Sequence, residues 1–372
     1  MSEIRLVNLR KEFKELVAVK DISITFPSST VTCLLGPSGC GKSTLMRIIA
    51  GLEEPSSGDI YFDNERVNDL SPSERHIGMV FQYPVVYRGM DVYRNIELPL
   101  LQDPYLRRHQ AERKERVESV IETLDLTHAV GKDISTLDNG TRQKVAVARE
   151  VARQPRIILF DEPITNVDVD SKVQLKQALK KLVKRHKQTI IYVTHDQTEA
   201  MTLGDQIVLM RNGEIVQSGT PGEIYNHPND RFGGWFLGNP GMNFVEHQVH
   251  RDGGATYLAS PLFQQPVQIT ELNGHQQVLV GIRPERVRLH QDGLPCTVEG
   301  EIIRRSIVVG GQHLLTIKVG GQTIKAKVPP DQLFEEHQRV WVECPLEHIT
   351  LFAPEGYRFD STLTYAQQEE TK

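Results

Sequence analysis

Residues 36–44 read GPSGCGKST, and their types and spacing suit the binding of a phosphate chain. The segment fits the pattern G-x-x-x-x-G-K-[ST] with Gly36, Pro37, Ser38, Gly39, Cys40, Gly41, Lys42, Ser43 and Thr44. Glycines let successive backbone N–H groups curl around phosphate oxygens, and a following helix N-terminus adds its dipole. Lys42 would reach the β and γ phosphates, and the Ser43 hydroxyl would ligate Mg²⁺. A chance glycine-rich turn is the alternative, but the flanking β-like and helix-like runs argue against it.

Two carboxylates follow an apolar run in RIILFDE, residues 156–162. Asp161, at the end of the expected strand, would hold Mg²⁺ through water, as the second metal anchor of nucleotide hydrolases. Glu162 would polarise the attacking water. A pair of acids after a strand is a weak signal alone, but it becomes strong beside a phosphate loop.

Composition limits the classes of protein to be considered. The chain has 372 residues, 39% hydrophobic and 24% charged, which is typical of a soluble protein with two domains. Its net charge of −5 disfavours a general nucleic-acid binder. The first ten residues contain no apolar h-region, and no run approaches the ~18 apolar residues that cross a bilayer. The four cysteines show no CxxC spacing, so we expect reduced thiols in a cytosolic protein.

The first ~235 residues alternate short apolar runs with helical periodicity, which predicts an α/β domain with a covered sheet. The expected strands are Ile4 to Asn8, Ile22 to Phe26, Val31 to Leu35, Ile60 to Phe62, Ile77 to Phe81, Ile157 to Phe160 and Thr189 to Val193. Asn212-Gly213 predicts a hairpin with a type I′ turn. Residues of about 88–155 predict a helical subdomain, in which the charge run of residues 106–124 is a solvated helix face.

From about residue 240 the pattern becomes β. Alternating segments are separated by Gly310-Gly311 and Gly320-Gly321, which predicts a small OB-like barrel. We therefore expect an ATPase-like domain over 1–237, a β-rich regulatory domain over 238–357 and a flexible tail over 358–372.

Further motifs make the chain resemble the ATP-binding subunits of ABC transporters, and within them the sugar-importer branch. VFQ at 80–82 is similar to the Q-loop, TNVD at 165–168 to the D-loop, and YVTHDQTEAMTL at 192–203 to the switch-histidine segment. GIRPERVRL at 281–289 is similar to the regulatory barrel of that branch. The resemblance covers about residues 3–355 and implies a P-loop ATPase that binds ATP and Mg²⁺.

The resemblance also implies roles for matching residues. Phe13 would stack on adenine, although a core role is the commoner reason for a single Phe. Gln82 would touch Mg²⁺ or the lytic water and relay nucleotide state to the membrane subunits. His195 would contact the γ-phosphate and hold the water and Glu162 in a reactive arrangement, whereas an isolated His after a strand is usually structural. Asp168 would act across a dimer interface.

One segment departs from the family pattern. LSGGQ normally closes over the ATP of the opposite subunit, but residues 137–141 read LDNGT. Leu137 and Gly140 match, whereas Asp138, Asn139 and Thr141 replace Ser, Gly and Gln. Asp138 and Gly140 would face nucleotide, but an ionised Asp has no proton to donate to phosphate. The loss is about 1.5–3 kcal/mol for the missing bond and up to ~4 kcal/mol of repulsion at 4 Å with an effective dielectric of ~20. The alternative is that Asp138 or Asn139 only caps the helix, which we expect to begin at or just before Thr141.

These observations predict an ATP-hydrolysing subunit on the cytoplasmic face of the cell inner membrane. The partners implied by the resemblance are two membrane-spanning permeases, a second ABC ATPase that is a different paralogue or the same chain, and indirectly a solute-binding protein, with no nucleic acid. The solute would be a carbohydrate or a polyol, and a glycerol-like compound is included in this class. A largely regulatory ABC subunit with weak hydrolysis and a soluble non-transport ABC ATPase stay open as alternatives.

Overall fold

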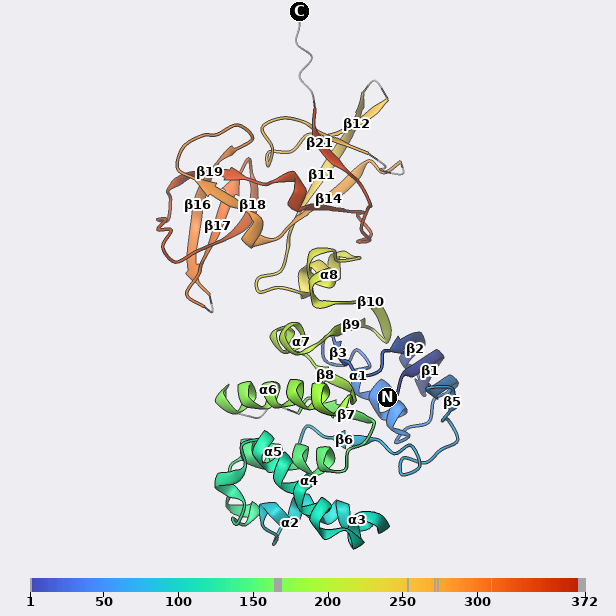
Figure 1. Ribbon diagram of the computed structural model, residues 1–372. Coiled ribbons are helices and arrows are strands. Elements are labelled where there is room, and N and C mark those ends of the chain that lie inside the picture. Colours follow the sequence, from blue (N-terminus) through green and yellow to red (C-terminus); the bar gives the residue numbers. More distant parts are fainter. Residues whose placement is uncertain are drawn as a thin grey trace, which may run out of the picture. The chain divides into compact units, whose positions relative to one another are not determined.

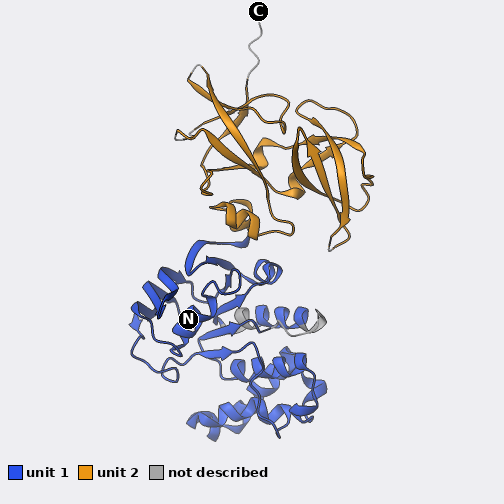
Figure 2. Ribbon diagram, turned by 180° about the vertical axis from the view of Figure 1, so that it is seen from behind, with its two compact units in different colours: residues 1–221 blue, residues 222–372 orange. Residues whose placement is uncertain are grey.

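The computed structural model describes residues 2–163, 169–252, 254–270, 272, 274–308 and 310–366. The chain forms two compact units, Met1–Pro221 and Gly222–Lys372, which Figure 2 distinguishes by colour. Residues 222–237, which we expected in the first domain, thus form part of the second compact unit. The expected domain boundary after residue 237 stays a prediction.

Two sheets form the framework of the first unit. An antiparallel sheet has the order β2-β1-β4-β5, with β2 Leu16–Phe26, β1 Ile4–Phe13, β4 Ser57–Phe62 and β5 Glu65–Arg66. A larger sheet has the order β10-β9-β3-β8-β7-β6, with β10 Glu214–Gly219, β9 Gln206–Arg211, β3 Val31–Leu35, β8 Thr189–Thr194, β7 Ile157–Asp161 and β6 Gly78–Val80. All pairs in the larger sheet are parallel except β9 with β10.

The sequence pattern explains this larger sheet. Every residue of β3, β7 and β8 is buried, as expected for continuous apolar runs in a parallel sheet covered on both faces. The expected strands are present with changed ends: the first extends to Phe13, the second begins at Leu16, and the strand expected at Ile77 to Phe81 spans only β6. The type I′ turn is confirmed, because Asn212 and Gly213 have φ of 52° and 84°.

The helices of the first unit fall into two groups. Those that follow strands of the larger sheet are α1 Lys42–Ala50, α6 Val169–His186 and α7 Gln197–Leu203. The expected helical region contains α2 Val92–Glu97, α3 Pro104–Arg108, α4 Gln110–Thr123 and α5 Asn139–Ala152, which gather at one end of the unit in Figure 1. Val117, Val120 and Ile121 are buried on α4 while most of its charged residues are exposed, so the solvated-face interpretation is confirmed.

The second unit begins with two short helices, α8 Pro221–Asn226 and α9 Arg231–Phe236. One antiparallel sheet follows the order β20-β14-β11-β12-β13-β21, with β20 Ile349–Phe352, β14 Gln277–Ile282, β11 Asn243–Asp252, β12 Ala255–Leu258, β13 Val267–Ile269 and β21 Leu363–Tyr365. The other follows β15-β19-β16-β17-β18, with β15 Arg288–His290, β19 Arg339–Glu343, β16 Val298–Ile307, β17 His313–Val319 and β18 Gln322–Val328.

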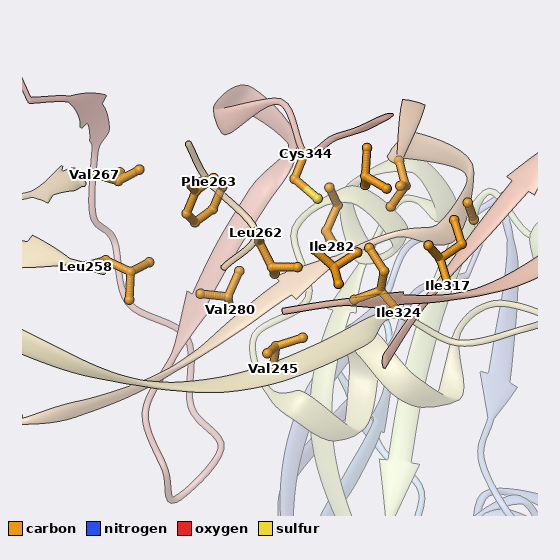
Figure 3. Close-up of a cluster of buried hydrophobic side chains, with 14 of the residues drawn as sticks. Val245, Leu258, Leu262, Phe263, Val267, Val280, Ile282, Ile317, Ile324 and Cys344 are labelled. Carbon is orange, nitrogen blue, oxygen red and sulfur yellow. The ribbon is translucent and has the colours of Figure 1, made fainter. Parts of the chain in front are cut away.

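One apolar core joins the two sheets of the second unit. It includes Val245 and Val280 of one sheet, Ile317 and Ile324 of the other, and Leu262 from the segment between β12 and β13; Figure 3 labels all five. The expected β-rich C-terminal domain is therefore correct. Both glycine pairs lie in turns of the second sheet, with φ of 92° and 77° at Gly310 and Gly311.

The expected flexible tail is wrong for residues 358–366. Phe359 is buried with only 6% of its surface exposed, and β21 pairs with β13. A strand of three residues is too short for its pattern to show in the sequence. Residues 367–372 lie outside the described part of the chain.

Candidate functional site

The glycine-rich loop between β3 and α1 requires glycine at two positions. A Cβ atom at Gly36 would lie 2.3 Å from the carbonyl oxygen of Met210, and one at Gly41 would lie 2.3 Å from that of Ala18. Gly41 also has a φ of 104°, which side-chain-bearing residues rarely adopt. The sequence folds into this tight curve because its glycines permit contacts with two other backbones.

Lys42 begins α1 and points its ammonium group into the loop. The residue is only 5% exposed. Its Nζ donates to the carbonyl oxygens of Gly36 at 2.8 Å and Pro37 at 2.9 Å, and lies 3.7 Å from Sγ of Cys40. A buried ammonium held by neutral carbonyls is a point of positive charge, and phosphate oxygens would satisfy it more strongly.

A cavity of about 660 Å³ opens beside this loop. Phe13, Leu16, Val17, Ala18, Lys20, Ser38, Gly39, Gly41, Lys42, Ser43, Thr44, Glu162, Asn212 and Gly213 line it. The Phe13 ring is 41% exposed and lies 4.7 Å from Nζ of Lys11. An apolar, aromatic wall beside a polar glycine-rich wall suits a ligand with a flat base and a phosphate chain. The cavity therefore fits ATP by size and by the chemistry of its walls.

Ser43 and Asp161 supply two oxygen atoms beside the loop. Oγ of Ser43 donates to Oδ1 of Asp161 at 3.1 Å. Two neighbouring ligands of an octahedral Mg²⁺ at about 2.1 Å would lie about 3.0 Å apart, so this pair fits adjacent coordination positions. No group of three or more His, Cys, Asp or Glu suitable for a metal ion occurs within the described residues.

Asp161 is a buried carboxylate. The residue is 9% exposed, and desolvation raises the pKa of its carboxyl group, with Glu162 adding to the rise. The hydrogen bond from Ser43 acts in the opposite direction. A cation at Asp161 would compensate the buried charge and would favour the ionised form.

Glu162 meets His195 at the carboxyl ends of two adjacent parallel strands. The backbone N–H of Glu162 donates to the carbonyl of Val193 at 3.0 Å, which ties the end of β7 to β8. Oε2 of Glu162 lies 3.1 Å from Nδ1 of His195. Glu162 has a φ of 45°, and such left-handed backbone at a residue other than glycine often occurs at active sites. In this arrangement the carboxylate of Glu162 could orient a water molecule, and the imidazole of His195 could hold that carboxylate in place.

A buried carboxylate supports the strand end that carries His195. Oε2 of Glu199 accepts hydrogen bonds from the hydroxyls of Thr194 at 2.8 Å and Tyr192 at 3.3 Å. Asp196 caps α7 by accepting from the N–H groups of Thr198 and Glu199. His195 is therefore held between a strand and a helix whose ends are both fixed.

Asp138 is the N-cap of α5. Its Oδ1 accepts from the N–H of Thr141 at 2.8 Å, and its Oδ2 accepts from the Thr141 hydroxyl at 2.7 Å. The backbone hydrogen bond from Thr141 lowers the pKa of Asp138, while partial desolvation opposes the shift. The expected helix start just before Thr141 is confirmed, and so is the capping role of Asp138. The exposed side chain is an ionised acceptor.

The structure gathers some of the predicted site residues and leaves others apart. The predicted site residues that line the cavity are Phe13, Ser38, Gly39, Gly41, Lys42, Ser43, Thr44 and Glu162, with Asp161 in contact with Ser43 and His195 in contact with Glu162. Gly36, Pro37 and Cys40 do not line it but lie against Nζ of Lys42. Gln82, Asp138 and Gly140 do not line the cavity within the first unit. Gln143 of α5 donates to the carbonyl of Phe81 at 3.2 Å, so the helix that begins at Asp138 is tied to the residue before Gln82. Asp168, with the rest of residues 164–168, lies outside the described residues.

The β9–β10 turn contributes to the cavity in a way that was not predicted from the sequence. Gly213 donates its N–H to the carbonyl of Cys40 at 3.0 Å and accepts from the N–H of Lys20 at 2.8 Å. The turn thereby closes one side of the cavity. Asn212-Gly213 predicted a hairpin. The position of this hairpin against residues 40–41 depends on long-range packing, which a local sequence pattern does not show.

Comparison with known protein families supplies the identity. A family model described as ABC transporter matches residues 19–165, one described as MalK OB fold domain matches 238–287, and one described as TOBE domain matches 280–352. The trehalose/maltose import ATP-binding protein MalK of Thermococcus litoralis is 37% identical over 369 residues, covering 95% of this chain and 98% of the relative. The chain belongs to the ATP-binding subunits of ABC transporters.

Other relatives agree with this assignment. The sn-glycerol-3-phosphate import ATP-binding protein UgpC 2 of Agrobacterium fabrum is 36% identical over 357 residues, covering 95% of this chain and 93% of the relative. Among solved structures, cbiO1 of Clostridium perfringens, part of an ABC transporter complex, has a TM-score of 0.54 and 27% identity, covering 59% of this chain and 89% of that one. The dimeric ABC transporter cassette MJ0796 has a TM-score of 0.52 and 30% identity, covering 59% and 98%.

The fold expectations and the enzyme class are thus confirmed. This ABC ATPase has a P-loop core followed by an all-β OB and TOBE region, belongs to the carbohydrate-importer branch and couples ATP hydrolysis to transport. No helix among the described residues is both long and apolar enough to cross a lipid bilayer.

Proposed function

We propose that this ABC ATPase energises import of a carbohydrate or polyol through two membrane-spanning permease subunits, and that it works beside a second, related ATPase subunit. It would bind peripherally at the cytoplasmic face of the membrane, with a solute-binding protein delivering the solute from the other side. The names of the relatives, trehalose/maltose import and sn-glycerol-3-phosphate import proteins, support the solute class.

The site residues support hydrolysis rather than a purely regulatory role. ATP would lie with its base near Phe13 and its phosphates along residues 38–44, where Lys42 neutralises the β and γ phosphates. Ser43 and Asp161 would hold Mg²⁺, which supplies charge neutralisation on the phosphate oxygens. Glu162 would accept a proton from the attacking water, and His195, 3.1 Å from that carboxylate, would keep it oriented. Gln82 and Asp168 would complete the site on nucleotide binding and dimer closure.

The pairing proposal is based on the state of Asp138. Both carboxylate oxygens already accept hydrogen bonds from Thr141, and the lowered pKa keeps the group ionised at neutral pH. It has no proton to donate to a phosphate of an opposing subunit. The missing bond costs about 1.5–3 kcal/mol, and repulsion adds up to ~4 kcal/mol at 4 Å with an effective dielectric of ~20.

A dimer of this chain would place Asp138 against both ATP molecules. A related partner with a hydrogen-bond donor at this position would instead serve the ATP held by Lys42 and Ser43. The partner's own ATP would then face Asp138 and turn over slowly. The proposal therefore predicts one working site and one slow site in each transporter.

ATPase activity of the purified chain alone tests this proposal. We expect slow, non-cooperative hydrolysis for the wild type and at least tenfold faster hydrolysis for Asp138→Ser, which restores a hydroxyl donor and keeps a good N-cap. Asp133→Ser is the matched control, because Asp133 is likewise an N-cap, whose carboxylate accepts from the N–H of Ser135 at 2.8 Å, but it lies outside the signature segment. Brisk cooperative hydrolysis by the wild-type chain alone would refute the pairing.

A further inference from the structure

The second unit contains a cavity of about 410 Å³ that the ATPase reaction does not use. Its walls come from the end of α8, from the segment after β14, from β20 and from residues 358–363; α8 and β14 are labelled in Figure 1. The lining residues are Asn226, His227, Met242, Arg283, Arg286, Glu347, His348, Ile349, Thr350, Leu351, Arg358, Phe359, Ser361 and Leu363. Three guanidinium groups therefore surround a space of the size that holds small ligands.

Arg283 carries a buried charge without a carboxylate in contact. The residue is 4% exposed, and its guanidinium donates to the carbonyls of Leu237, of Gly234 at 3.0 Å and of Tyr225 at 2.6 Å. It also lies 3.9 Å from the centre of the Tyr225 ring. Glu285 is near, but its carboxylate accepts from the Tyr225 hydroxyl and does not line the cavity. Neutral carbonyls orient the guanidinium, and Glu285 favours its positive charge without being in direct contact with it.

Arg286 and Arg358 add charge that is also weakly paired. Arg286 is exposed and has no side-chain hydrogen bond or ion pair with any described residue. Arg358 is 28% exposed, and its ion-pair partner Asp360, at 3.6 Å, is 96% exposed. Nε of Arg358 is buried and makes no hydrogen bond with the described residues. An exposed ion pair of this kind contributes little, so both arginines can engage a ligand.

Negative charge on the cavity wall is small by comparison. Glu347 is the carboxylate among the lining residues. Its side chain is 64% exposed and lies 3.9 Å from the guanidinium of Arg288, a residue that does not line the cavity. Met242 and Phe359, both nearly fully buried, provide an apolar surface beside the arginines. The cavity thus combines an excess of positive charge with a small apolar wall.

The geometry points to a binding site for the phosphoryl group of a small molecule, in which Arg286 and Arg358 contact the phosphate oxygens and the buried Arg283 adds its field. Planar guanidinium groups match phosphate oxygens in pairs, and a phosphate carries more charge at neutral pH than a carboxylate. Two sources supply this chemistry: inorganic phosphate, and a phosphorylated sugar or polyol whose carbon skeleton would lie on Met242 and Phe359. Occupancy of this site is independent of the proposed pairing of ATPase subunits.

Isothermal titration calorimetry of the full chain tests this inference. The chain is first saturated with Mg²⁺ and a non-hydrolysable ATP analogue, so that added phosphate has no access to the loop at Lys42. Glycerol 3-phosphate, inorganic phosphate and glycerate are then titrated separately. We expect glycerol 3-phosphate to bind, and Arg286→Gln and Arg358→Gln each to weaken that binding about tenfold or more. Arg339→Gln is the matched control, because Arg339 is 83% exposed in the same unit and does not line the cavity.

The three probes distinguish the outcomes. Tighter binding of glycerol 3-phosphate than of inorganic phosphate assigns the site to phosphorylated polyols or sugars, and equal binding assigns it to free phosphate. Glycerate binding as tightly as glycerol 3-phosphate would overturn the inference, as would absence of binding by either phosphate compound. Unchanged affinity in Arg286→Gln would also overturn it, because substitution of this exposed residue leaves the fold intact.

Discussion

Asp138 and Thr141 are joined by two hydrogen bonds, one from the Thr141 N–H at 2.8 Å and one from its hydroxyl at 2.7 Å. The same carboxylate therefore stabilises the start of α5 and lacks the proton that a phosphate-binding residue would donate. Capping the helix requires a hydrogen-bond acceptor at this position, whereas phosphate recognition requires a donor. The ionised Asp138 meets only the first requirement.

The capping bond predicts a pH-dependent loss of stability in Asp138→Asn. Because the folded-state pKa of Asp138 is lowered, its ionised form contributes stability that is present above the unfolded pKa and lost as pH falls through the folded pKa. We expect the wild type to exceed the variant in free energy of unfolding at pH 7, and the difference to vanish only once the pH has fallen through the lowered folded-state pKa of Asp138. Urea unfolding at several pH values measures this. A difference that is independent of pH would show that the charge does not contribute.

Removal of the buried charge at Asp161 is expected to stabilise the nucleotide-free protein. Burial raises the folded-state pKa of Asp161, so its protonated form contributes stability below the unfolded pKa, and this contribution is lost as pH rises through the folded pKa. At pH 7 the ionised Asp161 therefore destabilises the folded state. Asp161→Asn keeps an acceptor for Ser43 and should raise the free energy of unfolding at pH 7 by about 1 kcal/mol. The same variant should lose Mg²⁺-dependent nucleotide binding. Thermal unfolding with and without Mg²⁺ and ATP measures both effects, and a destabilised nucleotide-free variant would contradict the account.

The contact between Glu162 and His195 predicts strongly non-additive effects on ATP turnover. Glu162→Gln should lower kcat about 10²–10⁴-fold while leaving nucleotide affinity nearly unchanged. His195→Ala should have a comparable effect, because it removes the group that keeps the carboxylate and water aligned. The double variant should be little worse than either single variant, since the two side chains act as a unit. Multiplied losses in ATPase assays of the assembled transporter would indicate independent roles.

Gly41 and Gly39 offer a matched pair in the phosphate loop. Both have positive φ, but a Cβ at Gly41 would lie 2.3 Å from the Ala18 carbonyl, whereas nothing lies within 4 Å of one at Gly39. Gly41→Ala should therefore destabilise the protein by about 3 kcal/mol or more, and Gly39→Ala by about 1 kcal/mol from backbone strain alone. Chemical denaturation compares the two, and equal losses would contradict the close approach of the loop to Ala18.

The placement of the candidate site residues at one edge of the larger sheet was predictable from the strand and helix pattern. Lys42 and Ser43 begin the helix after β3, Asp161 ends β7 and His195 follows β8, and the carboxyl ends of these parallel strands meet at one edge of the sheet. The family resemblance implied that His195 acts together with Glu162, whereas the positive φ of Glu162 was not predicted, because it depends on how β7 ends beside β8.

Other features depended on packing over long sequence separations. The β9–β10 turn closes on Cys40 through Gly213, and the strand at Leu363–Tyr365 exists only because β13 offers an unpaired edge. Arg283 looks like a surface residue in the sequence, but three carbonyls on and around α8 and α9 hold its guanidinium in the interior. No pattern in a single segment carries such information.

ATP turnover by the purified transporter with Lys42→Ala in this chain alone tests the central claim most directly. We expect turnover to fall to the slow rate of the other site, because the remaining ATP, held by the partner subunit, would face Asp138. The wild-type complex and a Lys20→Ala complex are the references, since Lys20 lines the same cavity outside the phosphate loop. Retention of most of the wild-type turnover by the Lys42→Ala complex would contradict the account, because the working site would then belong to the partner.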